Sequence, residues 1–155
     1  MNADEAVQNG TDVTSFRMEQ WPFYWMTQFT GSYLRRIELG LKGIGLDIPR
    51  WRVLMSLRGR ESLSVSEIAD HAIVKLPTMT KIIQRMQAEN LVIAQQSPTD
   101  GRVTEVRLTS QGHEAGEKAW AVANRIYRRA FEEVSEAEIA NLNVLLRKIT
   151  ANLAD

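Results

Sequence analysis

Apolar residues recur every three or four positions along most of this chain, which is the spacing of one face of an α-helix. The first such stretch begins near Pro22, a residue suited to the first turn of a helix, and continues to Gly43. Asp47 is a candidate N-cap for a second helix, whose apolar stripe ends near Gly59. The pattern therefore predicts two consecutive helices.

Two more helices, joined by a short turn, are predicted next. The segment Ser64-Val65-Ser66-Glu67 has the form of a capping box, in which the serine hydroxyl and the glutamate carboxylate satisfy free backbone N–H groups at a helix start. Residues 73–76 are predicted to form the turn, because the residue before Pro77 resists helical geometry and Pro77 suits a first turn. Asn90 tolerates left-handed backbone geometry and is expected to end the second helix.

The second of these helices has two different faces. Four apolar residues follow the helical spacing and are expected to face the core: Met79, Ile82, Ile83 and Met86. The opposite face is small, polar and basic, as a helix in a DNA major groove needs to be. An ordinary solvated helix face has the same composition, so this pattern alone leaves both readings open.

After Asn90 the spacing of apolar residues changes from the helical period to an alternation of apolar and polar positions, which indicates a β-hairpin. Pro98-Thr99-Asp100-Gly101 has the residues of a turn. An isolated hairpin is marginally stable, so its apolar side is expected to pack against the helices and leave the tip exposed. Arg102 is then placed to enter a DNA minor groove, and Asp100 is expected to pair with an arginine and stiffen the wing. The alternative is a turn-forming Asp-Gly pair beside a solvated arginine.

Two long helices are predicted after the hairpin. Thr109 is a candidate cap for the first, and Ser135-Glu136-Ala137-Glu138 is a second capping box. The last helix carries an apolar stripe at spacings of three and four: Ile139, Leu142, Leu146, Ile149 and Leu153. Such a stripe either closes an intramolecular core or meets its copy in a second chain.

Composition narrows the possible functions. The chain has 155 residues, 44% of them hydrophobic, which suits one compact unit over 15–155 after a polar, flexible tail at 1–14. The net charge is zero, but the charges are acidic near the start and basic over 35–60. The absence of cysteine excludes disulfides and thiolate metal sites. No apolar run or signal-peptide pattern suggests a membrane or an export route, so a cytoplasmic location is expected.

An enzyme is not expected. The two histidines, His71 and His113, are far apart, and no phosphate-binding loop motif is present. We therefore expect no catalytic residues, no metal site and no cofactor.

Several segments, in order, resemble the MarR family of bacterial transcription regulators. They are W-R-V-L at 51–54, S-V-S-E-I-A at 64–69, P-T-M-T-K at 77–81, R-M-Q-A-E-N-L-V at 85–92, and D-G-R followed by V-R-L-T up to Thr109. The resemblance covers about residues 20–153. It implies a mainly α fold with a small β wing, with a winged helix-turn-helix over about 47–109 and dimerisation helices over about 17–46 and 110–155.

The resemblance also implies a function. Members are usually homodimeric repressors of pseudo-palindromic double-stranded DNA near their own gene, and many respond to a small aromatic or phenolic effector. Lys81 stands where arginine is frequent in the family, which could alter the bases that are read, and Asn90 stands where glycine is frequent. The candidate DNA-binding residues are Lys75, Pro77, Thr78, Thr80, Lys81, Gln84, Arg85, Asp100 and Arg102.

Aromatic residues in the first two helices are candidates for an effector site. The family places effectors between the dimerisation helices and the winged part, and aromatic walls with a cation suit an aromatic carboxylate. The candidates are Trp21, Tyr24, Trp25, Phe29, Trp51 and Arg52. Core packing explains the same aromatic pattern without a ligand. Likewise, a winged helix that contacts only proteins, or that binds DNA without sequence preference, is the alternative to a sequence-specific regulator.

Overall fold

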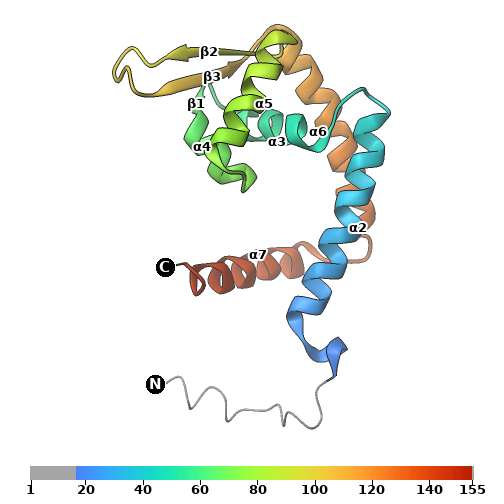
Figure 1. The fold of residues 1–155 in the computed structure, drawn as a ribbon. Helices are drawn as coiled ribbons and strands as arrows, with labels where there is room; N and C mark the ends of the chain where they lie inside the picture. The colour runs from blue at the N-terminus through green and yellow to red at the C-terminus, as the bar shows by residue number, and fades with distance from the viewer. Residues whose placement is uncertain (1–16, 155) are drawn as a thin grey trace. The chain divides into compact units, whose positions relative to one another are not determined.

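The computed structural model describes residues 17–154, so the tail predicted at 1–14 lies outside the described residues. Figure 1 shows the elements in chain order: η2 (Met18–Gln20), α2 (Pro22–Lys42), α3 (Ile48–Leu57), β1 (Leu63–Ser64), α4 (Val65–Ala72), α5 (Leu76–Ala88), β2 (Val92–Gln96), β3 (Thr104–Leu108), α6 (Ser110–Ala130) and α7 (Glu136–Ala151). The chain divides into two compact units, Met1–Arg36 and Ile37–Asp155, and α2 runs across the boundary.

The predicted helix caps are confirmed. Asp47 accepts a hydrogen bond from the backbone N–H of Arg50 at 3.0 Å, at the start of α3. Ser64 and Ser135 each form a complete capping box with the glutamate three residues on. Thr109 caps α6 through its side-chain oxygen. Each cap satisfies backbone donors that the first helical turn leaves without a partner.

The wing is a hairpin within a larger sheet. Strands β2 and β3 pair antiparallel, with Val92 opposite Leu108, as the alternation predicts. The two-residue strand β1 also pairs with β3, which makes a three-stranded sheet in the order β1-β3-β2. The two-stranded prediction missed β1 because two residues are too short to show an alternation. Figure 1 shows the hairpin extending beyond the helices that it packs against.

The core of the second unit lies between the helices and the sheet. On α5, Met79, Ile83 and Met86 are buried and Ile82 is half-buried, so the predicted core face is confirmed. They join other buried side chains from α2, α3, α4 and the sheet, including Ile37, Leu41, Val53, Leu54, Leu57, Ile68, Val92 and Val106. This core fixes the position of α5, which leaves the opposite face of the helix exposed.

Two backbone features hold the end of α5 and the start of α6 together. Asn90 has φ 59°, the left-handed geometry expected for the residue that ends a helix. Its carbonyl accepts a hydrogen bond from the hydroxyl of Thr109 at 2.6 Å. One turn into α6, Gly112 packs so closely that a Cβ there would lie 1.9 Å from the carbonyl oxygen of Leu91. The helix can approach the sheet at this point only because residue 112 is glycine.

The turn between α4 and α5 contains an unusual residue. Ile73 has φ 54°, in the left-handed region that β-branched residues rarely adopt, and 92% of it is exposed. The turn was predicted at 73–76, and α5 in fact begins at Leu76, one residue before Pro77. Proline therefore occupies the first turn of α5, where its missing N–H costs nothing.

Candidate nucleic-acid interface

A groove runs between α5 and the wing. Its volume is about 570 Å³, and it is lined by Ser64, Val65, Ser66, Leu76, Thr80, Ile83, Gln84, Gln87, Ala94, Arg102, Val103 and Thr104. Thr80 and Gln84 come from α5 and Arg102 from the wing tip, so the fold brings three of the predicted DNA-binding residues to one surface. The other lining residues were not predicted, because their convergence depends on how the strands and α4 pack rather than on any local pattern.

The remaining candidates do not line this groove, but they too lie on the surface. All nine predicted DNA-binding residues are exposed. Lys75 is the N-cap residue of α5, and Pro77, Thr78 and Lys81 follow in its first two turns. The N-terminal part of α5 therefore presents polar and basic side chains to a partner, together with the positive end of the helix dipole.

The wing tip is ordered by Asp100. Its carboxylate accepts the backbone N–H of Arg102 at 3.0 Å, and the Arg102 guanidinium Nε lies 3.9 Å from the same oxygen. This is the pairing with an arginine that the sequence predicts. The Arg102 side chain is 96% exposed, and an exposed ion pair contributes little free energy. The turn is thus held mainly by the backbone hydrogen bond, which leaves the guanidinium accessible.

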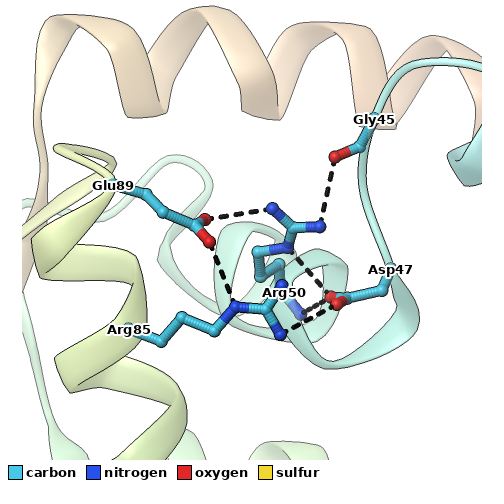
Figure 2. A network of polar contacts seen from close by, with 5 residues as sticks. All are labelled: Gly45, Asp47, Arg50, Arg85 and Glu89. Atoms are coloured by element: carbon cyan, nitrogen blue, oxygen red, sulfur yellow. Dashed lines mark hydrogen bonds and ion pairs between the residues drawn. The ribbon is translucent and has the colours of Figure 1, made fainter.

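Arg50 joins three segments behind α5 (Figure 2). Its guanidinium lies 3.1 Å from the carboxylate of Asp47 and 3.0 Å from that of Glu89, and it donates to the carbonyl of Gly45 at 3.1 Å. The side chain is 15% exposed, so these contacts are partly shielded from water. The loop before α3, α3 itself and the C-terminal end of α5 are therefore tied together by one cation.

Arg85 belongs to the same network. Its Nε lies 3.0 Å from Glu89 and its Nη1 lies 3.5 Å from Asp47, as the dashed lines in Figure 2 show. The sequence placed Arg85 on the DNA-facing side of α5, and 59% of its side chain is indeed exposed. Its guanidinium nevertheless already bridges two carboxylates. Only the pair with Glu89, four residues on, had a signal in the sequence.

The charges of this network shift two pKa values. Partial burial raises the pKa of Asp47, but the hydrogen bonds from Arg50 and the positive charges of Arg50 and Arg85 outweigh it, so the pKa lies below its ordinary value. For Arg50, partial burial lowers the pKa, and the hydrogen bonds to Asp47 and Glu89 more than compensate and raise it. Both groups are therefore held in their charged forms.

The candidate effector residues fall in two groups, one in each unit. In the first unit, the rings of Tyr24 and Trp25 meet edge to face at 5.0 Å, and the Trp25 indole N–H donates to the carbonyl of Glu19 at 2.8 Å. In the second unit, the guanidinium of Arg52 donates to the carbonyl of Ala72 at 3.2 Å. Arg52 thus has a structural bond at the C-terminal end of α4. The remaining candidates are Trp21 and Phe29, which are exposed, and Trp51, which is half-buried.

Two further features are absent from residues 17–154. No group of three or more histidine and acidic residues in this range could hold a metal ion. No helix in this range is long and apolar enough to cross a membrane.

The helix-turn-helix, the hairpin after it and the groove between them define a winged helix-turn-helix protein. The family model described as MarR family matches residues 46–104. The HTH-type transcriptional repressor IacR of Pseudomonas putida is 44% identical over 138 residues, which cover 89% of this chain and 83% of that protein. The chain therefore belongs to the MarR family and is a DNA-binding transcription regulator.

Solved structures share the fold. A MarR-family regulator from Silicibacter pomeroyi matches with a TM-score of 0.83 at 22% identity, over 93% of this chain and 97% of that one. BpsR of Bordetella bronchiseptica, whose DNA binding is regulated by 6-hydroxynicotinic acid, matches with a TM-score of 0.76 at 21% identity, over 91% and 99%. The mainly α architecture with a small β wing is thereby confirmed.

Proposed function

We propose that this chain is a transcriptional repressor that binds pseudo-palindromic double-stranded DNA as a homodimer, through α5 and the wing. The observation that carries this proposal is the groove that brings Thr80, Gln84 and Arg102 together on one exposed surface. Such a regulator acts in the cytoplasm, where the bacterial chromosome lies, and the proposal includes no catalytic step.

The residues of this surface have different roles in the proposal. Thr80 and Lys81, on α5, contact base edges in the major groove, since residues in the first turns of a recognition helix reach the bases. Lys75, at the start of α5, neutralises a phosphate. Arg102 enters the minor groove, whose negative potential is strongest where it is narrow. Base contacts carry the specificity and phosphate contacts fix the register.

The apolar face of α7 supports a homodimer. None of its residues is buried, and Leu142, Leu145 and Leu146 are 41%, 47% and 37% exposed. An exposed apolar patch of this kind marks an interaction site, and most bacterial regulators of palindromic DNA are twofold symmetric. In a twofold dimer, the two copies of α5 reach half-sites about 34–36 Å apart on one face of the DNA.

A small aromatic acid is the proposed effector class. BpsR, a solved structure with the same fold, is regulated by such a molecule. Trp21, Trp25 and Trp51 are among the candidate residues, so binding would change the tryptophan fluorescence. A panel of aromatic acids should include at least one that alters both the fluorescence and the DNA affinity. If none alters either quantity, this effector class is wrong.

Fluorescence anisotropy tests the DNA-binding proposal. The full chain is titrated into labelled DNA from beside its own gene and into a shuffled duplex, each at two salt concentrations. A sequence-specific regulator binds the native duplex more tightly, and its affinity falls steeply with salt because counterions are released from the phosphates. Weak, equal binding to both duplexes would contradict an operator at that location, and weak salt dependence would favour a protein-contact module.

Two variants separate the proposed roles. Arg102→Ala should weaken binding to all duplexes by a similar factor, whereas Lys81→Ala should change which duplex is preferred, by about 1–3 kcal/mol for a direct base contact. An equal loss on every duplex from both variants would show that this division between wing and helix is wrong.

A further inference from the structure

We propose that the edge of α5 facing the wing reads the 5-methyl group of a thymine, through the side chain of Leu76 and the methyl group of Thr80. The proposal rests on the DNA-binding role of the groove between α5 and the wing, and it adds the base chemistry that this groove recognises. Leu76 was not among the residues that the sequence singled out.

The lining of the groove is mostly uncharged. Of its twelve residues, Arg102 alone is charged, and five have aliphatic side chains: Val65, Leu76, Ile83, Ala94 and Val103. The other seven are polar, and their hydroxyl, amide and guanidinium donors can contact a sugar-phosphate strand. The 5-methyl of thymine is the one apolar group that base pairs present in the major groove. The aliphatic side chains of this lining therefore fit a thymine methyl rather than a phosphate.

Leu76 is well placed for such a contact. It is the first residue of α5, and 49% of it is exposed although it borders the groove. The first turn of a recognition helix is the part that reaches base edges. Covering this leucine with a thymine methyl would remove apolar surface of both partners from water.

The hydroxyl of Thr80 is already engaged within the helix. It donates to the carbonyl of Leu76, one turn earlier, at 2.9 Å. This bond orients the side chain and uses its only O–H donor, so the residue has its methyl group and an acceptor oxygen left for a partner. Leu76 and Thr80 are one helical turn apart, so the leucine side chain and the threonine methyl lie on the same edge of α5 as one apolar surface.

Arg85, the arginine of α5, does not line this groove. Arginine reads guanine through its planar fork, but the guanidinium of Arg85 lies between Glu89 and Asp47. The residues of α5 that line the groove include no cation, so at this edge of the helix we expect the base to be read by apolar contact.

The test begins with selection of bound duplexes from a randomised library by the full wild-type chain. In the best-selected duplex, each thymine is then replaced in turn by deoxyuridine, which removes only the 5-methyl group, and affinities are measured by fluorescence anisotropy. Wild type should lose about 4-fold in affinity at one thymine per half-site, which is the factor expected for one buried methyl group. The Leu76→Ala variant should lose most of this preference and keep only the part that the methyl of Thr80 contributes.

Three further variants sharpen the result. Thr80→Val keeps the methyl group and should retain the preference for thymine, whereas Thr80→Ser keeps the hydroxyl and should reduce it. Gln84→Ala, one turn further along the same edge, is the matched control: it can lower the affinity but should leave the ratio between thymine and deoxyuridine unchanged. Retention of the preference by Thr80→Ser and its loss in Thr80→Val would overturn the assigned role of Thr80.

The outcomes distinguish this inference from the function on which it rests. If no duplex is enriched, the DNA-binding role of the groove itself fails. If a duplex is enriched but no thymine is sensitive to loss of its methyl, or if the sensitivity is undiminished in Leu76→Ala, the groove binds DNA and the thymine contact is wrong.

Discussion

Helices α4 and α7 begin with the same capping motif, but their apolar faces lie in different environments. Ser64 and Ser135 accept hydrogen bonds from the N–H of Glu67 and Glu138 at 3.2 and 3.3 Å, and both glutamates complete a capping box. Yet α4 buries Ile68 and its neighbouring alanines, whereas no side chain of α7 is buried. A cap specifies where a helix starts, but it does not specify what covers the apolar face.

The same difference separates the winged helix-turn-helix, which contains α4, from α7. In the winged helix-turn-helix, the apolar stripes close on one another and on the sheet, so its core is complete within one chain. In α7, an equally regular stripe has no fully buried member within residues 17–154. We infer that the first part folds around its own core and that the second needs another copy.

The largest expected effect comes from charging the face of α7. Leu142→Glu combined with Leu146→Glu should convert the dimer to a monomer, because each subunit would bury two carboxylates in an apolar contact, at a total cost of about 4 kcal/mol or more. Sedimentation across a concentration series measures the dissociation constant. Ala140→Glu with Ala151→Glu adds the same charge to the opposite face and should leave the dimer intact. A dimer that survives the leucine substitutions would place the interface elsewhere.

The next largest effect concerns the packing of α6 on the sheet. Gly112→Ala should destabilise the winged part by about 2–5 kcal/mol, because its Cβ would overlap the backbone of Leu91, which cannot move as a side-chain end could. Gly116→Ala is the control on the same helix, where a Cβ meets no atom within 4 Å. It should be neutral or stabilise by up to about 1 kcal/mol. Urea unfolding at one fixed protein concentration measures both. Equal stabilities would show that the fold accommodates a Cβ at residue 112 and would contradict this role of the glycine.

A smaller effect is expected from the network around Arg50. Arg50→Met removes the more buried of the two cations that pair with both Asp47 and Glu89, and leaves Arg85. It should cost about 1–3 kcal/mol of unfolding free energy, less than for a fully buried pair because water reaches the site. Lys118→Met removes an exposed cation of α6 and serves as the control, with a change within about 0.5 kcal/mol. Urea unfolding of the two variants should therefore separate them clearly; the same small change in both would assign the network no role in stability.

The smallest effect is a pH dependence at Asp47. Its pKa in the folded chain lies below the ordinary value of 3.8, so its ionised form stabilises the fold above that pH, and the contribution is lost as the pH falls through the folded pKa. Asp47→Asn keeps a good N-cap and loses the charge. Wild type should exceed this variant by about 1 kcal/mol or less at pH 7, after solvent screening. The difference should begin to fall near pH 3.8 and should vanish only below the lowered pKa of the folded chain. A difference that is constant down to pH 2 would rule out the ion pairs as its source.

The sequence predicted what depends on neighbouring residues. The caps at Asp47, Ser64 and Ser135, the left-handed Asn90 and the hairpin after it all have local signals, and all are present. These features depend on backbone donors and turn geometry within a few positions, which is the range that periodicity and capping rules cover.

Contacts between distant segments were not predictable in this way. Arg50 and Glu89 are 39 residues apart, and nothing local to either residue indicates the other. Strand β1 and the groove residue Leu76 likewise take their roles from how the sheet packs beside α5. The sequence placed the wing and the recognition helix correctly as elements, but the surface between them needed the fold.

Hydrogen exchange of the full wild-type chain over a dilution series tests the central claim most directly. Amides of α4 and α5 should keep their protection at all concentrations, because their core lies within one chain, while amides of α7 should lose protection at the concentration where sedimentation shows the dimer dissociating. Equal protection of α7 and α5 in the dilute monomer would contradict the claim that α7 depends on a second copy.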